Sequence, residues 1–125
     1  MKRPFTFTGR IRSFKYAFEG IGVMLRSQQN AWIHLAATIM VVIFGHILNL
    51  SYTEWCFIVL AIMAVWMAEA LNTAFEFLAD VTNPEFHPLV KKSKDVAAAA
   101  VLISAIGAIV IAWFIFVPKI VTMIF

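Results

Sequence analysis

The chain has 125 residues, of which 62% are apolar and only 14% are charged, and its formal net charge is +3. Soluble domains carry roughly 25% charged residues and about half apolar residues, so lipid must cover much of the surface of this protein. The length allows one domain over residues 1–125 and no separate soluble module, and a single cysteine, Cys56, excludes an internal disulfide and a thiolate metal cluster.

The first predicted element is an amphipathic helix over residues 10–26. Its apolar side chains recur at spacings of three and four residues and so form one stripe: they are Ile11, Phe14, Phe18, Ile21 and Leu25. Such a helix lies in the membrane interface with its apolar face toward the lipid. The same basic segment could instead serve only as a topology signal. It does not resemble a signal peptide, because it has no continuous apolar core and no small-residue cleavage site.

Three apolar stretches follow, over residues 31–50, 55–79 and 96–117. Each can reach the roughly 20 residues that a membrane-spanning helix needs. Backbone amide groups cannot stay unpaired in lipid, so each stretch is expected to be a helix. The predicted fold class is therefore an all-α membrane protein with an N-terminal surface helix and three transmembrane helices.

The basic residues predict the orientation of these helices. Lysine and arginine residues precede the first span and lie between the second and third spans, while the turn over residues 49–54 has none and Lys119 stands alone after the third span: the other nine are Lys2, Arg3, Arg10, Arg12, Lys15, Arg26, Lys91, Lys92 and Lys94. Cytoplasmic loops of membrane proteins carry an excess of lysine and arginine. We therefore expect the N-terminus and the loop over residues 80–95 in the cytoplasm, and the C-terminus outside.

The second span carries polar residues on one face. They recur at a spacing of three or four residues: Glu69, Asn72, Thr73, Glu76 and Asp80. Glu76 and Asp80 are expected at the cytoplasmic boundary, and Glu69 about 10 Å deeper, at roughly 1.5 Å per residue. A charge at this depth costs at least about 2.5–3.5 kcal/mol on insertion scales. The pattern predicts a functional site, although such residues could also serve only to hold helices together.

The following loop adds Lys94 and Asp95 directly before the third span. The ammonium group of Lys94 could hold a phosphate, and Asp95 could hold Lys94 or a magnesium-bound water. The small residues 97–100 permit close packing of the third helix against the carboxylate face. Phosphoryl transfer needs mainly positioning, a metal and charge neutralisation, so these residues predict a site where a nucleotide meets the hydroxyl group of an amphiphile. The sequence has no Walker A loop and no glycine-rich kinase loop.

Residues from about 13 to 102 resemble the small bacterial membrane lipid kinases, the family of prokaryotic diacylglycerol kinase and undecaprenol kinase. The resemblance rests on Asp80 and on residues 69–76 and 94–102, which are EALNTAFE and KDVAAAAVL. Further matches resemble the undecaprenol kinase branch more than the diacylglycerol kinase branch: they are residues 13–20, Asn30 with residues 33–34, and residues 84–88.

The resemblance implies a homotrimer in a bacterial cytoplasmic (inner) membrane, with composite active sites in which ATP and Mg²⁺ phosphorylate a lipid alcohol, here undecaprenol. Glu69 would be the general base, and Glu76 and Gln28 would stand at the metal. The nucleotide would contact Tyr16, Glu76, Glu85, His87, Lys94 and Asp95. The residues that support the site or the substrate would be Asn72, Asp80, Asn30 and His34. No nucleic-acid partner is expected.

Gln28 departs from the family pattern, because the family usually has a second metal-binding glutamate at this position. An amide oxygen can ligate magnesium but brings no charge, and magnesium binds mostly through carboxylates and phosphates. We therefore expect weaker metal binding, unless Glu19 substitutes for the missing carboxylate.

Three alternatives stay open. The first is a diacylglycerol kinase that makes phosphatidic acid by the same mechanism. The second is a weakened, non-catalytic membrane assembly subunit, which Gln28 motivates. The third is a small proton-coupled transporter that uses Glu69, but three spans and the presence of Lys94 and Asp95 argue against it.

Overall fold

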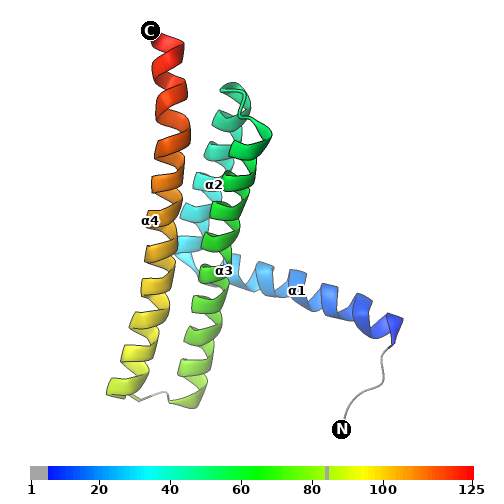
Figure 1. Cartoon of the computed structure of the whole chain (residues 1–125). Coiled ribbons are helices and arrows are strands. Elements are labelled where there is room, and N and C mark those ends of the chain that lie inside the picture. Colours follow the sequence, from blue (N-terminus) through cyan, green and yellow to red (C-terminus); the bar gives the residue numbers. More distant parts are fainter. Residues whose placement is uncertain (1–5, 84) are drawn as a thin grey trace.

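The computed structural model describes residues 6–83 and 85–125, and within these residues it consists of helices without strands. The chain forms α1 (Phe7–Ser27), α2 (Gln29–Ile47), α3 (Tyr52–Thr82) and α4 (Pro88–Ile124) (Figure 1). Lys2 and Arg3, which contribute to the predicted orientation, and Pro84, which contributes to the resemblance, lie outside the described residues.

Helices α2, α3 and α4 are each long and apolar enough to cross a membrane. The predicted fold class is confirmed, since an N-terminal helix precedes three candidate spans. The last two helices are longer than their apolar stretches because polar residues cap them. The Ser51 hydroxyl accepts a hydrogen bond from the Glu54 backbone amide and starts α3. The His87 side chain accepts one from the Leu89 amide, and Pro88 occupies the first turn of α4.

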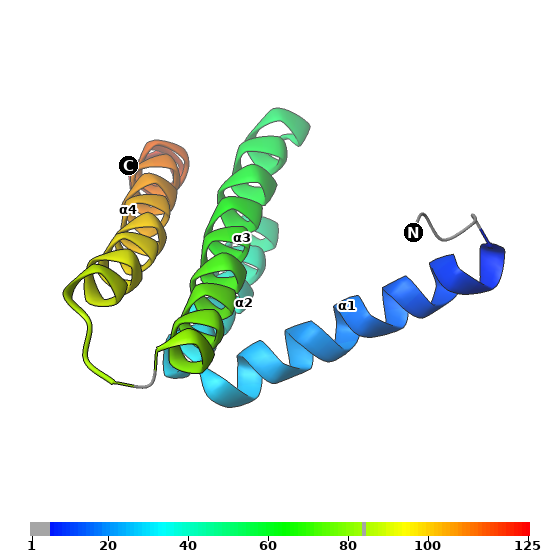
Figure 2. The same cartoon turned by 90° about the horizontal axis from the view of Figure 1, so that it is seen from below.

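Helix α1 projects sideways from the bundle formed by α2, α3 and α4 (Figures 1 and 2). Its apolar stripe remains exposed at Ile11, Phe14 and Phe18, and Met24 at the bundle end is its one buried residue among those described. The chain changes direction at Gln28, whose extended backbone ends α1 and starts α2. An exposed apolar stripe on a helix that lies across the spans fits the membrane interface.

Helix α3 packs mainly against α4 and makes smaller contacts with α2 and α1. Near the turn between α2 and α3, the Trp55 ring lies so close to Gly45 that a β-carbon there would come within 2.6 Å of it. The same end is closed by an ion pair between Lys119 on α4 and Glu54 on α3, 3.1 Å apart. We call this the Glu54 end of the bundle, and we call the opposite end, where α3 connects to α4, the Asp80 end.

The apolar section of the bundle has the thickness of a membrane. Glu54 and Glu76 are 22 residues apart on α3, which is about 33 Å at roughly 1.5 Å per residue. The hydrocarbon core of a bilayer is about 30 Å thick. Helix α1 joins the bundle at the level of Glu76, because Gln28 contacts that residue. Glu76 therefore lies at one border of the apolar section, and Glu69 lies about 10 Å inside it.

Candidate active site

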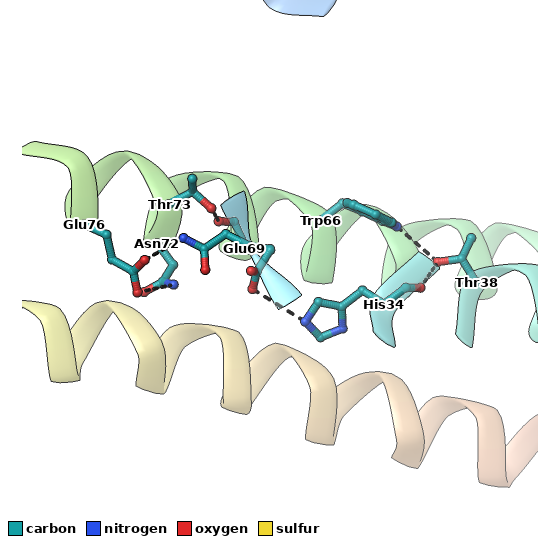
Figure 3. A network of polar contacts seen from close by, with 8 residues as sticks. His34, Thr38, Trp66, Glu69, Asn72, Thr73 and Glu76 are labelled. Carbon is teal, nitrogen blue, oxygen red and sulfur yellow. Dashed lines mark hydrogen bonds and ion pairs between the residues drawn. The ribbon is translucent and has the colours of Figure 1, made fainter. Parts of the chain in front are cut away.

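The polar face of α3 is turned inward, where α2 covers part of it (Figure 3). Glu69 has 0% of its surface exposed, Asn72 has 5% and Thr73 has 4%. The hydroxyl group of Thr73 donates to the backbone carbonyl of Glu69 at 2.8 Å. A helix that carries a fully buried carboxylate must offset a large desolvation cost, so the surroundings of Glu69 show what this face is for.

Glu76 is held by two amide side chains. Gln28 donates from Nε2 to Oε2 of Glu76 at 2.6 Å, and Asn72 donates from Nδ2 to Oε1 at 3.4 Å. Both oxygens of the carboxylate are thus oriented by uncharged donors. Gln28 reaches this position because the chain breaks between α1 and α2 at this residue. The contact joins residues 48 positions apart and places Gln28, Asn72 and Glu76 in one cluster.

Glu69 lies next to His34 from α2. The distance between Nε2 of His34 and Oε2 of Glu69 is 3.6 Å, which is close for two charged groups but longer than a hydrogen bond. Within residues 6–83 and 85–125, neither carboxylate oxygen of Glu69 nor Nε2 of His34 has a hydrogen-bond partner. A buried polar atom without a partner costs about 1–3 kcal/mol. Such groups in native structures are rare and often have a redox or catalytic role.

A small network fixes the position of His34. The Thr38 hydroxyl donates to the backbone carbonyl of His34 at 2.7 Å, and Nε1 of Trp66 donates to that hydroxyl at 3.1 Å. The Trp66 ring also meets the imidazole edge to face, with centroids 6.5 Å apart. No motif in the sequence marks Trp66 as part of the site. The signal was its spacing, since Trp66 lies one helical turn before Glu69 and Thr38 one turn after His34.

A second polar group lies at the Asp80 end, outside the apolar section. Nζ of Lys94 lies 3.0 Å from Oδ1 of Asp80, and Nζ of Lys91 lies 2.6 Å from Oδ2 of Asp95. The expectation that Asp95 holds Lys94 is therefore not met, because Asp80 on the neighbouring helix takes its place. These are solvent-exposed pairs, and such pairs are worth only about 0–1 kcal/mol. Each lysine can therefore exchange its carboxylate for another anion at little cost.

The remaining candidate residues stand apart from these two groups. Tyr16 is exposed on α1 and Glu85 is exposed before α4, and in the described part of the chain neither makes a polar contact with Glu76 or Lys94. His87 caps α4 through Nδ1. Asn30 lines a small cavity with His34 and Asn72.

The donor atoms around Glu76 are few. Glu19, which could have replaced the missing family glutamate, instead lies 3.8 Å from Lys15 on the exposed side of α1. No cluster of three histidine, cysteine or acidic side chains suited to a metal ion occurs in the described part of the chain. Any metal at Glu76 must therefore take further ligands from amide oxygens, water or a bound substrate.

Comparisons with known proteins identify relatives over most of the chain. Residues 15–116 match the family described as prokaryotic diacylglycerol kinase. The chain is 40% identical to the undecaprenol kinase of Bacillus subtilis over 108 residues, which cover 86% of this chain and 88% of that protein. It is 32% identical to a diacylglycerol kinase of Synechocystis over 112 residues, or 89% and 64% of the two chains. It is 30% identical to a diacylglycerol kinase of Helicobacter pylori over 104 residues, or 78% and 81%.

Proposed function

The chain belongs to the prokaryotic diacylglycerol kinase family and is thus a membrane lipid kinase that uses ATP, and we propose that it converts undecaprenol to undecaprenyl phosphate. The observation that carries the proposal is the pairing of Glu69, fully buried inside the apolar section, with His34 at 3.6 Å. A lipid hydroxyl can reach this depth from the membrane, while ATP can reach Glu76 and Lys94 from water.

Glu69 acts as the general base in this proposal. Its carboxylate can accept the proton of the lipid hydroxyl while the hydroxyl oxygen attacks the γ-phosphorus of ATP. The bond between the γ-phosphorus and the bridging oxygen breaks, and ADP leaves with that electron pair. His34 supports the base, because its Nε2 lies 3.6 Å from Oε2 of Glu69 and can orient the carboxylate by donating a hydrogen bond to it. General base catalysis of this kind contributes about 10²–10⁴-fold in rate.

The residues around Glu76 fit a magnesium ion that is shared with the nucleotide. Magnesium in kinases is held by one or two carboxylates together with substrate phosphates and water, and Glu76 supplies one carboxylate. Oδ1 of Asn72 is a buried acceptor with no hydrogen-bond partner in the described residues. Gln28 would add an amide oxygen after its side-chain amide turns over. The ion, when bound, neutralises charge on the β- and γ-phosphates.

The nucleotide would lie at the Asp80 end. Lys94 would move from Asp80 to the phosphates, which costs little because the existing pair is exposed. The family resemblance further assigns Tyr16, Glu85, His87 and Asp95 to the nucleotide. Tyr16 lies near the middle of the projecting helix α1, 12 residues from Gln28 and so about 18 Å along the helix from it; we propose that it serves a site shared between subunits of a homotrimer.

The proposed membrane orientation follows from the charges and the depth of the site. Apart from Lys119 at the Glu54 end, the described lysines and arginines lie on α1 and on the first turns of α4, at the Asp80 end. With that end in the cytoplasm, ATP has direct access to Lys94 and the C-terminus lies outside. The single lipid kinase domain over residues 1–125 would then reside in the bacterial inner membrane.

The choice of undecaprenol over diacylglycerol rests on the greater identity to the undecaprenol kinase, 40% against 32% and 30% for two diacylglycerol kinases. Purified protein with labelled ATP and Mg²⁺ should be offered each lipid in turn, with Glu69→Gln as the inactive control. Labelled undecaprenyl phosphate without phosphatidic acid is the expected result. Phosphatidic acid as the main product would favour the diacylglycerol kinase, and no product from any lipid alcohol would favour the non-catalytic subunit that Gln28 motivates.

A further inference from the structure

A slot runs between α2 and α4, with α3 at its base. It consists of two adjoining cavities of 210 and 270 Å³ that share Ile33, His34 and Ala105. Helices α2 and α4 make little contact with each other. The main packing partner of α4 is α3. We call this space, from Asn30 and Ala98 to Val41 and Ala112, the α2–α4 slot.

One end of the slot is polar and lies at the catalytic pair. Asn72 lines it, is 5% exposed and has an unpartnered Oδ1 within the described residues. His34 also lines it, and Glu69 lies 3.6 Å behind the imidazole. Two buried polar groups at one end of an apolar space are suited to a ligand with a single polar head. A hydroxyl group placed there would lie beside the base that the proposed reaction needs.

The rest of the slot is apolar and slender. Four of the α4 residues that line it are alanines, at positions 98, 105, 108 and 112, and the larger α4 side chains in the lining are Val101, Leu102 and Ile109. Ile33, Ala37 and Val41 form the α2 wall. By contrast, the 920 Å³ groove between α3 and α4 is lined by longer side chains such as Met63 and Met67, and Lys92 lies at its Asp80 end. That groove reaches Asn72 but does not reach His34.

The length of the slot exceeds one leaflet of a bilayer. Ala98 and Ala112 are 14 residues apart on α4, which is about 21 Å at roughly 1.5 Å per residue. The hydrocarbon core is about 30 Å thick, so one leaflet supplies about 15 Å. His34 lies beside Ala105, so a chain that starts there runs about 10 Å along the slot to Ala112. Because Glu69 is already about 10 Å inside the apolar section, the far end of the slot lies about 20 Å from that border, beyond the middle of the membrane. The acyl chains of a two-chain lipid in the cytoplasmic leaflet end near that middle.

We propose that the α2–α4 slot binds the hydrocarbon chain of the lipid alcohol and selects one long chain over a pair of shorter ones. This inference rests on the proposed function, because it assumes that the hydroxyl of a lipid alcohol reacts next to His34 and Glu69. It goes further in assigning chain selection to the slender α4 wall, and in particular to Ala108 and Ala112.

The first test fills the slot with Ala108→Phe and adds the same bulk outside it with Ile106→Phe, since Ile106 is exposed at nearly the same depth. The assay measures kcat/KM for prenyl alcohols of increasing chain length, together with the KM for ATP. Filling the slot should lower kcat/KM for long chains by at least about tenfold, because methylene groups that were buried are excluded. It should change kcat/KM for short-chain alcohols and the KM for ATP by no more than about twofold. Ile106→Phe should leave kcat/KM unchanged for every chain length.

An equal loss for all chain lengths, or an equal loss in Ile106→Phe, would overturn the assignment. Native mass spectrometry should compare the subunit assembly of the two variants. A subunit assembly that only Ala108→Phe disrupts would mean that a second copy fills the slot.

A second test does not depend on activity. A photoreactive side chain at position 112, and at position 106 as the control, is combined with a labelled long-chain polyprenol in vesicles. Crosslinking from position 112 alone supports the slot even if no product forms, in which case the proposed function fails and the binding site stands. Crosslinking from position 106 alone, or from neither position, refutes the slot.

Discussion

Restoring the family carboxylate with Gln28→Glu is the sharpest test of how Glu76 is arranged. At present Gln28 donates to Oε2 of Glu76 at 2.6 Å, and Asn72 donates to Oε1 at 3.4 Å. The substitution removes the shorter donor and places a second negative charge next to the first. Without a metal ion the two carboxylates repel each other, and with a metal ion both become ligands.

The expected size of the effect follows from this geometry. Loss of a hydrogen bond to a charged group costs about 1.5–3 kcal/mol. Two unit charges about 4 Å apart add up to about 4 kcal/mol at an effective dielectric constant of roughly 20. Both side chains are partly solvated, so we expect the metal-free variant to lose about 2–3 kcal/mol of stability. Metal binding relieves the repulsion, and each 1.4 kcal/mol that is relieved lowers the magnesium requirement about tenfold.

The assay follows thermal unfolding in bilayer discs and the phosphorylation rate, both as functions of Mg²⁺ concentration. Gln28→Glu should unfold at a lower temperature without Mg²⁺, recover with Mg²⁺ and ATP, and reach half-maximal rate at lower Mg²⁺. Gln29→Glu adds the same charge at an exposed neighbouring position. It should leave both the unfolding temperature and the Mg²⁺ concentration for half-maximal rate unchanged. A magnesium requirement that stays the same or rises would refute the reasoning, because Glu76 would then not lie at the metal.

Three further substitutions test the remaining roles. Glu69→Gln keeps the size of the side chain but weakens it as a proton acceptor, so kcat should fall about 10²–10⁴-fold while ATP binding, measured by calorimetry, stays unchanged; a near-normal kcat would exclude Glu69 as the base. His34→Ala removes the group 3.6 Å from Glu69 and should lower kcat by a smaller factor, about tenfold, with little change in the KM for ATP; a larger change in that KM would assign His34 to the nucleotide instead. Lys94→Gln should raise the KM for ATP but not for the lipid, whereas Lys92→Gln, two residues away, should change neither, and equal effects would contradict a specific role for Lys94.

The sequence was informative where structure depends on local periodicity. The apolar stripe of α1 and the polar face of α3 follow from spacings of three and four residues, and the structure contains both. The depth of Glu69 follows from the rise of a helix. Such features depend on neighbours within one or two turns, and a single chain contains all the necessary information.

Contacts between different helices could not be predicted from the local periodicity of the sequence. The bond from Gln28 to Glu76 depends on the change of direction between α1 and α2, which carries no turn signal such as glycine or proline. The partner of Lys94 depends on how α4 packs against α3, and that packing brings it to Asp80 on α3 and not to Asp95, its neighbour in the sequence. The sequence does not mark Trp66 as part of the site, because its hydrogen bond to Thr38 depends on the register between α2 and α3.

The carboxylate of Glu69 also explains why α2 lies where it does. An isolated α3 would expose this charge to lipid at a cost of at least about 2.5–3.5 kcal/mol, so the polar face has to be covered by protein. A third of the most apolar window of α3 is buried, against 11% for α2 and 6% for α4, so α3 is the helix that the others shield. Helix α2 brings His34 rather than an apolar side chain to this face. An apolar side chain would offer the carboxylate no polar neighbour, whereas the imidazole places Nε2 3.6 Å from it. The choice of His34 at this contact is therefore the feature of the bundle that points to proton transfer rather than to helix packing.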